Sequence, residues 1–591
     1  MKRSIFIVGL LLSMFAFSQS EEIADDYFKR GEFEKALITY QKLNENNNNF
    51  NISYKIISTL QQLERYDEAQ NVIVDFMTKY KLPMFLVEMG YNYQLKDSLD
   101  IANQYYNKAV SLIEEKPAYT SSVANQFEIH SLLDEAIIVY KKGMELLPEA
   151  NFNIQLARIY GEQGNVEQMF SNYIDYTELK PVFLNNTKRI FSDFISENKD
   201  NENNLILKKL LLKKIQEQPN TYWYELLSWL FVQEKEYSKS FTQEKALYKR
   251  NPESLDRIIE LAVAAVNAKV YGTAQDIFKY VLENSQDIQT VLLAHQYLLD
   301  IGAQNASKKE LLEIDKKYLD LFKQYGTYEP TLSLQIAYGN FLAFYLQKPE
   351  EAGQLLKQSL KLNLSAFQEA TVKLKLGDIL VLQERFNEAL IYYTQIQANL
   401  KNSTISQEAR FKVAKTSYYK GDFDWAEAQL KILKSSTSQL IANDALDLKL
   451  LISDNKYDDS LHVALKLYAK ADLMAFQNKT DEAISLLDTI LTEHKGESIV
   501  PQALFKQAQL FEQKKQFEKA LANYQSIITN YRDGILVDDA YYFLAELYND
   551  QLALPEKAKE LYEKIIFDHQ DSIYFVDARK KFRMLRGDAI N

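Results

Sequence analysis

The strongest constraint on this chain is a repeat about one helical hairpin in length. In the N-terminal half, one position recurs with a large apolar residue four places later, at Ala36 with Tyr40, Ala69 with Ile73, Ala102 with Tyr106, Ala136 with Tyr140 and Met169 with Tyr173. The first residues of these pairs are spaced by 33, 33, 34 and 33 residues. Repeats of this length are single supersecondary units that bury their apolar faces by stacking. The period therefore predicts an all-α solenoid of stacked helix-turn-helix units.

Two further features fit this prediction. Twelve residues before the recurring position there is a second small residue, followed three places later by a bulky one, as in Gly90 with Tyr93 and Ala124 with Phe127. The chain contains only 16 Gly and 10 Pro among 591 residues. Because sheet-rich folds use both residues in turns and bulges, a large β domain is disfavoured.

Together these residues resemble the tetratricopeptide repeat, whose period is 34 residues and whose units often close on a proline. Prolines close several units of this chain, at Pro148, Pro181, Pro219 and Pro252. The resemblance implies a right-handed α-solenoid superhelix in which the first helix of each unit, the A helix, lines the concave face. The second helix of each unit is called the B helix below. The resemblance also implies that the chain binds proteins or peptides rather than catalysing a reaction.

Changes in the period predict the domain boundaries. Between Ala274 and Ala352 lie 78 residues, and the 57 residues between Ala426 and Ala483 fit no whole number of units. We also expect one long helix over 307–325. The expected segments are an N-terminal array of 33–34-residue units at 19–284, an irregular helical junction at 285–335, units of 37 residues at 336–434, a degenerate hairpin at 435–462, C-terminal units at 463–572, and a capping helix and tail at 573–591.

The first eighteen residues predict a signal peptide. Lys2 and Arg3 precede an uncharged run at 5–17, and Ala16 and Ser18 are the small residues that precede a cleavage site. The run would span about 20 Å as a helix, too short for a bilayer core of about 30 Å. No later run is long and apolar enough for a membrane span, and no cysteine could carry a lipid anchor. We therefore expect an exported chain without an integral membrane span.

The predicted location comes from a second resemblance. The longer C-terminal units, with entries such as 498–503 and 572–578, resemble tetratricopeptide proteins of the bacterial cell envelope. This resemblance implies a soluble periplasmic protein, with secretion as the second choice.

The sequence offers no motif for catalysis. Cysteine is absent, which excludes thiolate chemistry, zinc–thiolate sites and iron–sulfur clusters. The glycines form no phosphate-binding loop, and the five histidines are too scattered to form a metal-binding pair on one helix. We therefore expect no cofactor, no metal and no enzymatic activity. The net charge of −12 also argues against nucleic acid as a partner.

The candidate partner-binding residues come from counting along the A helices. Lys375, Lys412 and Lys506 share the sixth position of their helices, and Lys415 holds the ninth position, where other units have Asp378 and Asp472. These lysines could bind an acidic segment of a partner by charge complementarity, although an ordinary solvated helix face is the alternative. In the N-terminal half, the same counting gives a mixed surface without a single sign of charge, made of Glu88, Tyr91, Asn125, Gln155 and Arg158. Of these, Tyr91, Asn125 and Arg158 are the candidate binding residues.

The sequence therefore favours a non-enzymatic, exported scaffold that binds a protein or peptide. One alternative is an envelope-assembly factor, or one associated with the cell wall or its glycans. A second alternative is a hydrolase that uses carboxylates from adjacent hairpins.

Overall fold

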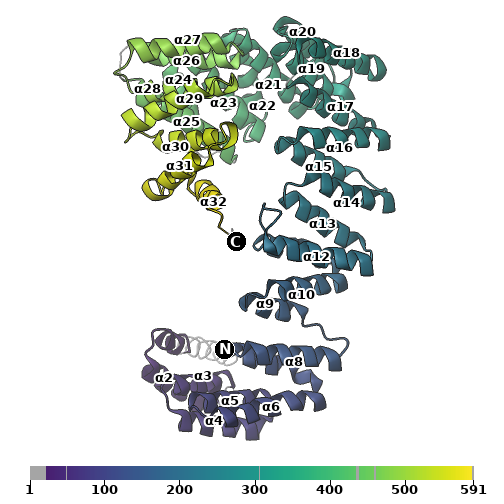
Figure 1. The fold of residues 1–591 in the computed structure, drawn as a ribbon, viewed down its shortest axis with the longest axis vertical. Coiled ribbons are helices and arrows are strands. Elements are labelled where there is room, and N and C mark those ends of the chain that lie inside the picture. Colours follow the sequence, from purple (N-terminus) through teal and green to yellow (C-terminus); the bar gives the residue numbers. More distant parts are fainter. Residues whose placement is uncertain (1–20, 48–49, 305, 434–437, 458–460, 589–591) are drawn as a thin grey trace, which may run out of the picture. The chain divides into compact units, whose positions relative to one another are not determined.

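The computed structural model describes residues 21–47, 50–304, 306–433, 438–457 and 461–588. Every regular element within these ranges is a helix (Figure 1). Most helices form antiparallel pairs that stack on the next pair along the chain. The prediction of an all-α solenoid of stacked helix pairs is therefore confirmed. The predicted signal peptide at 1–18 lies outside the described residues, as do parts of the predicted degenerate hairpin and tail.

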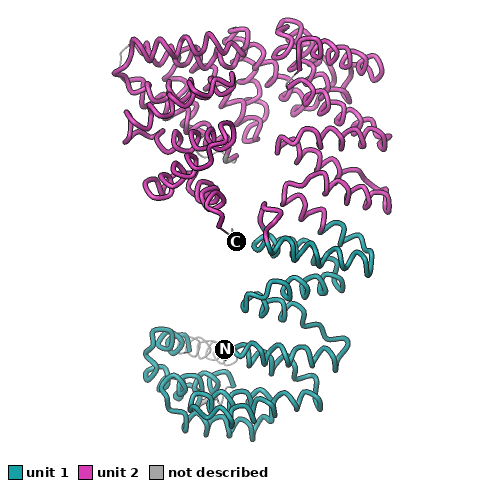
Figure 2. Tube along the Cα trace, in the orientation of Figure 1, with its two compact units in different colours: residues 1–195, 202–226 teal, residues 196–201, 227–591 magenta. Residues whose placement is uncertain are grey.

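The chain divides into two compact units (Figure 2). Unit 1 comprises residues 1–195 and 202–226, and unit 2 comprises residues 196–201 and 227–591. The division lies within the array predicted at 19–284. The predicted junction at 285–335 and degenerate hairpin at 435–462 both belong to unit 2.

Unit 1 consists of the first hairpins. Residues 21–29 are helical. The elements that follow are α2 (Phe33–Asn47), α3 (Phe50–Gln62), α4 (Tyr66–Tyr80), α5 (Met84–Leu95), α6 (Leu99–Glu115), η1 (Pro117–Tyr119), α7 (Thr120–Ile129), α8 (Leu133–Leu146), α9 (Asn153–Glu162), α10 (Val166–Leu179), η2 (Pro181–Phe183), α11 (Leu184–Ser192) and α12 (Glu202–Glu217). Helix α13 (Thr221–Gln233) continues into unit 2.

Unit 2 contains the later hairpins and both register breaks. Its helices are α14 (Tyr237–Arg250), α15 (Asp256–Asn267), α16 (Tyr271–Asn284), α17 (Ile288–Ala303), α18 (Lys308–Tyr325), η3 (Glu329–Thr331), α19 (Leu332–Phe344), α20 (Pro349–Ser359), α21 (Ala366–Leu382), α22 (Phe386–Asn399), α23 (Thr404–Lys420), α24 (Phe423–Leu433), α25 (Gln439–Asn455), α26 (Val463–Phe476), α27 (Thr480–Glu493), α28 (Val500–Gln513), α29 (Phe517–Asn530), α30 (Val537–Glu546), the π-helical turn η4 (Leu547–Gln551), α31 (Pro555–Asp568) and α32 (Phe575–Arg586).

The small residues of the repeat allow the two helices of a hairpin to approach closely. A Cβ atom on Gly90 of α5 would overlap the ring of Tyr106 on α6, and one on Gly377 of α21 would overlap the ring of Tyr393 on α22. Both tyrosines are buried. The small residue and the aromatic residue of each unit therefore form a single packing contact, which explains their fixed spacing in the sequence.

The first register break contains the long helix expected at 307–325. Helix α18 begins after Ser307, whose side chain accepts a hydrogen bond from the backbone of Glu310, and Glu310 caps Ser307 in return. This capping box fixes the start of the helix. Gly326, with a φ of 77°, ends it.

At the second register break, where the sequence predicted a degenerate hairpin at 435–462, the described residues 438–457 and 461–462 contain one helix, α25, and the start of the segment that leads to α26. Helix α26 then packs on α27 and on α23. Its C-terminal end also reaches earlier hairpins, because the Gln477 side chain donates to the Leu382 carbonyl at 3.0 Å. The ring of Phe476 lies 5.6 Å from that of Phe344, at the end of α19. Helix α26 therefore adjoins the ends of A helices that precede it by two and three hairpins.

Candidate functional site

The predicted lysines lie on A helices of unit 2. Lys375 is on α21, Lys412 and Lys415 are on α23, and Lys506 is on α28. These four residues are called the lysine row below. Lys412 and Lys415 share one face of α23 because they are three residues apart. Between 26% and 37% of each lysine side chain is exposed.

Each member of the lysine row has a polar partner within the chain. The Lys412 ammonium lies 3.0 Å from Asp378, and Lys375 donates to the Asn340 amide oxygen at 3.0 Å. A second aspartate, Asp472 of α26, lies 2.7 Å from the Lys506 ammonium and 3.5 Å from the Lys415 ammonium. The structure therefore brings all four lysines into two groups, each around one aspartate, and α23 carries a lysine from each group.

The two closest ion pairs repeat with the period of the fold. Asp378 and Lys412 are 34 residues apart, as are Asp472 and Lys506. In each pair the ninth position of one A helix meets the sixth position of a following A helix. The sequence places all these residues at fixed positions, but the contact between the two positions depends on how neighbouring A helices stack.

Burial and charge act against each other in this region. Burial raises the pKa of Asp472, but the nearby Lys415 and Lys506 outweigh it and lower that pKa overall. Burial lowers the pKa of Lys375, and the charge of Asp378 only partly opposes the change. The two lysines therefore stabilise the charged form of Asp472, whereas at Lys375 the loss of hydration outweighs the attraction of its neighbours. Chemically, this arrangement allows one carboxylate to replace another beside a lysine.

A half-buried acid, Asp300, lies near Lys375 of the lysine row. Burial raises the pKa of Asp300 on α17 to about 6, although a hydrogen bond from Tyr318 and the charge of Lys375 oppose the change. The Tyr318 hydroxyl lies 3.4 Å from the carboxylate. Asp300 therefore becomes protonated more readily than an ordinary aspartate.

The candidates in unit 1 have different surroundings. The ring of Tyr91 stacks on that of His130 with centroids 3.8 Å apart, and Arg158 pairs with Glu128 at 3.0 Å. Asn125 is exposed. The structure does not gather these three predicted residues into one contact group, and they remain candidates.

Beside Tyr91 lies a buried polar group around Glu88, a residue that the counting along the A helices gave, together with partners that it did not give. The Glu88 cluster consists of Tyr54 on α3, Glu88 on α5, and Gln126 on α7 with the adjoining His130. The Tyr54 hydroxyl donates to Glu88 at 2.8 Å, and His130 Nε2 lies 2.7 Å from the same oxygen. Gln126 donates to Tyr54 at 2.6 Å and contacts Glu88. Glu88 is only 1% exposed, so the cluster acts as a hydrogen-bonded joint between three A helices.

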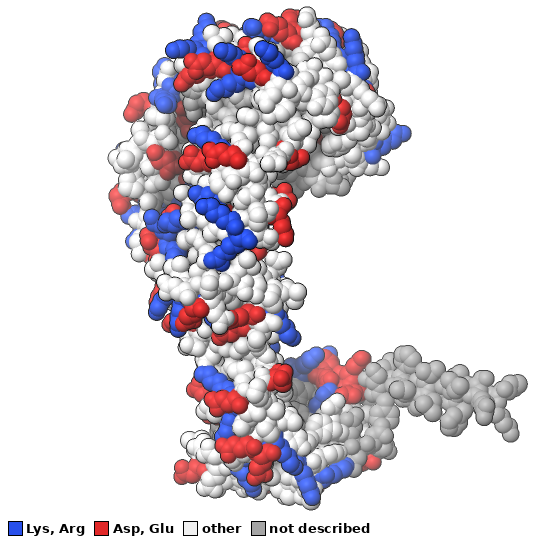
Figure 3. Space-filling model, turned by 90° about the vertical axis from the view of Figure 1, so that its right-hand side faces the viewer, with Lys and Arg blue, Asp and Glu red and all other residues white. Residues whose placement is uncertain are grey.

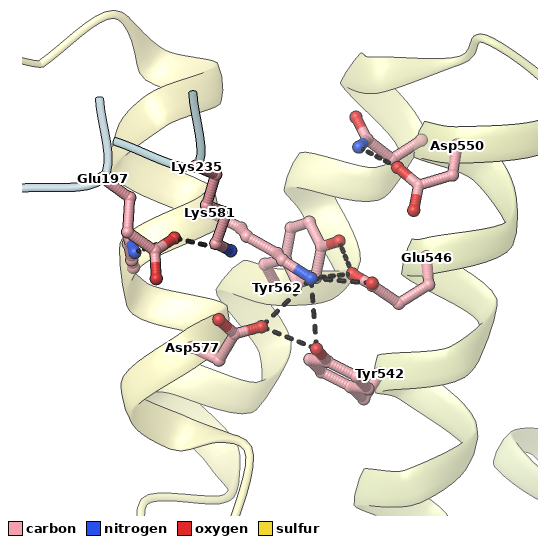
Figure 4. Close-up of polar contacts among 10 residues, drawn as sticks. Glu197, Lys235, Tyr542, Glu546, Asp550, Tyr562, Asp577 and Lys581 are labelled. Carbon is pink, nitrogen blue, oxygen red and sulfur yellow. Dashed lines mark hydrogen bonds and ion pairs between the residues drawn. The ribbon is translucent and has the colours of Figure 1, made fainter. Parts of the chain in front are cut away.

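A third polar group joins the last helices (Figure 4). The Lys581 ammonium lies 2.6 Å from Glu546 and 3.0 Å from Asp577, and Tyr542 donates to Asp577 at 2.6 Å. Tyr562 contacts Glu546. Burial lowers the pKa of Lys581, but its hydrogen bonds to these groups raise it overall. Lys581 and Glu546 are 35 residues apart, close to the 34 residues that separate the ion pairs of the lysine row.

An open cleft of about 800 Å³ lies between α16, α17 and α18. Apolar residues such as Leu298 and Leu321 line it together with His295, Lys279 and Glu313. Burial lowers the pKa of His295. The cleft occupies the first register break, where α18 packs less closely than a regular hairpin partner.

Charged side chains of both signs are interspersed on the face of the molecule shown in Figure 3. Within the described residues, no three His, Asp or Glu side chains gather as metal ligands. In the same part of the chain, no helix is long and apolar enough to cross a membrane.

Comparison with known proteins identifies one repeat directly. Residues 502–534, which include most of α28 and α29, match the tetratricopeptide repeat family. The chain therefore contains at least one tetratricopeptide repeat, as the sequence pattern predicts. A search of curated proteins finds no match to the sequence.

Several solved structures can be aligned with most of the chain at low identity and low TM-score. The crystal structure of the APC/C hetero-tetramer Cut9-Hcn1 matches at 12% identity over 95% of both chains, with a TM-score of 0.26. Yeast Tom70 matches at 16% identity over 85% of this chain and 99% of that chain, with a TM-score of 0.30. The structure of Naa15/Naa10 bound to HypK-THB matches at 12% identity over 97% and 94% of the chains, with a TM-score of 0.28. These values support no inference about partners.

Proposed function

We propose that this chain is a non-enzymatic scaffold that binds another protein along the A helices of unit 2. The observation that carries the proposal is the lysine row, in which four lysines on three A helices form two groups around Asp378 and Asp472. The tetratricopeptide match at 502–534 includes one of these helices. Helical hairpins stacked in this way present a long surface on which many modest contacts can add up.

The binding mechanism is an exchange of carboxylates. An acidic segment of the partner replaces Asp378 or Asp472 beside the lysines. Each lysine therefore has a carboxylate partner both before and after binding. Because the internal ion pairs must be broken, only a segment with several acidic groups competes effectively. Exposure of about a third of each lysine leaves room for this approach, and salt weakens the attraction.

Capture of partners in the native host tests this proposal. Crosslinking followed by mass spectrometry is carried out with the wild-type chain and with the Lys412→Glu, Lys415→Glu variant. We expect the variant to lose the captured partner while remaining folded by circular dichroism. The matched control is Lys401→Glu with Lys495→Glu, two exposed lysines of the same unit that lie outside the row. Equal capture by both variants would refute the role of the lysine row.

We further propose that the chain is exported and acts in a bacterial cell envelope. The supporting observations are the sequence pattern at 1–18 and the long C-terminal repeats. Sequencing the N-terminus of the native protein should find a chain that begins at or near Gln19, in a soluble fraction outside the cytoplasm. An intact Met1 on a protein in the cytoplasm would contradict export.

A further inference from the structure

Within the part of the chain that the structure describes, helix α25 has no hairpin partner like those of the neighbouring A helices. Helices α19, α21 and α23 each pack along their length on the helix that follows, namely α20, α22 and α24. Helix α25 instead packs mainly on the preceding α24, and to a smaller extent on α23, while α26 packs on α27 and α23. Within the described residues, the place of a B helix beside α25 is therefore not taken by α26.

The exposed side of α25 carries large apolar residues. Ala445, Leu448 and Ile452 form its buried side. Four large residues on the opposite side are exposed. Their exposed fractions are 77% for Leu440, 48% for Leu446, 39% for Leu450 and, just beyond the helix, 80% for Tyr457. These four residues, with Asp447 and Asp454, are called the outer face of α25. Spacings of four and seven residues place Leu446, Leu450 and Tyr457 on one stripe of the helix.

The neighbouring structure fixes α25 in place. Lys456, directly after the helix, pairs with Asp424 at 3.1 Å and with Glu427 at 2.6 Å, both on α24. The Ser498 hydroxyl donates to the Asp454 carbonyl at 3.1 Å and to the Asn455 side chain at 2.8 Å. Exposure of the apolar stripe is thus a property of a firmly attached helix.

The exposed charges beside this stripe are mainly acidic, but the ammonium of the buried Lys456 lies 5.0 Å from the centre of the Tyr457 ring. Asp447 and Asp454 lie on the outer face, and the single lysine of α25, Lys449, is half-buried on its flank. Burial raises the pKa of Asp447, and the charge of Asp444 adds to this effect. Burial likewise raises the pKa of Asp539 on α30, and the charges of Asp538 and, to a smaller extent, Asp447 add to this effect, although a hydrogen bond from Tyr574 opposes it.

We propose that the outer face of α25 binds an amphipathic helix of another protein, with an apolar stripe flanked by Lys or Arg. Such a helix takes the place of the missing B helix, and its cations meet Asp447 and Asp454. The 17 residues of α25 offer a contact about 25 Å long, enough for several turns of a partner helix. A second copy of this chain fits less well, because it would place acidic faces together in a protein of net charge −12.

A synthetic helix tests this assignment. The probe is a fluorescent leucine–lysine peptide of about 18 residues with a single apolar stripe, compared with a leucine–glutamate peptide of the same pattern. Fluorescence anisotropy with the full chain should show binding of the lysine peptide alone. Leu446→Ser with Leu450→Ser should weaken that binding at least tenfold, and Asp447→Asn with Asp454→Asn should weaken it severalfold and flatten its salt dependence.

A matched variant distinguishes binding at this site from nonspecific binding to exposed apolar residues. Ile391→Ser with Ile432→Ser changes two isoleucines on α22 and α24 that are 57% and 56% exposed, and it should change the affinity less than twofold. Equal losses in both leucine and isoleucine variants, or equal binding of the two peptides, would overturn the proposal. A dimer that forms with increasing concentration and disappears in the leucine variant would assign this face to a second copy instead. The lysine row is untouched, so the two proposals fail independently.

Discussion

Glu88 in unit 1 and Lys375 in unit 2 occupy the same position of the repeat but carry opposite charges. Each lies two residues before the glycine that contacts the aromatic residue of the next helix, Gly90 and Gly377. Glu88 is satisfied by Tyr54, His130 and Gln126, whereas Lys375 binds Asn340 and faces Asp378. The comparison shows that the stacking of the A helices fixes the position of the buried polar contact. The side chains of the adjoining A helices determine whether its central residue is acidic or basic.

Overpacking the two glycines tests the shared framework and should have the largest effect. Gly377→Val forces a side chain against Tyr393 and should destabilise the fold by about 3 kcal/mol, the upper part of the usual range for overpacking. Because each hairpin contacts mainly its neighbours, hydrogen exchange should increase in α21–α24 and stay unchanged in unit 1. Gly90→Val should instead increase hydrogen exchange around α5 and α6 in unit 1 and leave it unchanged in α21–α24. Loosening of the whole chain by either variant would contradict a segmented solenoid.

Removing the acid from unit 1 tests its hydrogen-bonded joint. Glu88→Ala leaves the buried donors of Tyr54 and Gln126 without their acceptor, so the free energy of unfolding should fall by about 2 kcal/mol. Urea denaturation measures the loss, which should hardly change in 1 M salt because the cluster is shielded from solvent. A strong salt dependence would indicate that the cluster acts as an exposed ion pair.

A change of pH sharpens the comparison through Asp300 in unit 2. Its pKa of about 6 is raised in the fold, so the folded state binds a proton more tightly than the unfolded state. Asp300 should therefore lower the free energy of unfolding above about pH 6, and this destabilisation should disappear as the pH falls towards 4. Asp300→Asn should stabilise the chain by about 2 kcal/mol at pH 7.5 and by much less at pH 4.5. A stabilisation that does not vary with pH would contradict this account.

Neutralising Asp472 should have the smallest effect on stability. Asp472→Asn removes the carboxylate beside Lys415 and Lys506 and should cost about 1 kcal/mol at neutral pH, because the lysines remain partly exposed to water. The pKa of Asp472 is lowered in the fold. Its stabilisation is therefore present above the ordinary pKa and lost as the pH falls below about 4. In 1 M salt the difference between variant and wild type should shrink, in contrast to Glu88→Ala.

Much of the fold follows from local residue patterns. The spacing of alanine and aromatic residues predicts the hairpins because each pattern describes one packing contact, such as that of Gly377 with Tyr393. Helix α18 could be predicted for the same reason, since Ser307 and Glu310 form its cap within four residues. Helix α25 could not be predicted as a lone helix, because its separation from α26 depends on contacts with earlier hairpins.

The binding candidates were predictable as positions but not as contacts. Counting placed Lys412 and Asp378 on A helices, yet their pairing depends on the offset between stacked helices one repeat apart. The Glu88 cluster shows the same limit, because Gln126 lies outside the positions that were counted. A search for opposite charges spaced by 34 residues could have found Asp378 with Lys412 and Asp472 with Lys506.

The central claim is that partner carboxylates compete with Asp378 and Asp472 for the lysine row. A titration of a fluorescent acidic peptide of glutamate and glycine against three forms of the full chain tests it most directly. Relative to wild type, Asp378→Asn with Asp472→Asn should bind the peptide more tightly, and Lys412→Glu with Lys415→Glu should not bind it. As the salt concentration rises, the affinity of the wild type for the peptide should decrease, and so should the increase in affinity caused by the two asparagine substitutions. Equal affinities for all three forms, or weaker binding by the asparagine variant, would contradict the claim.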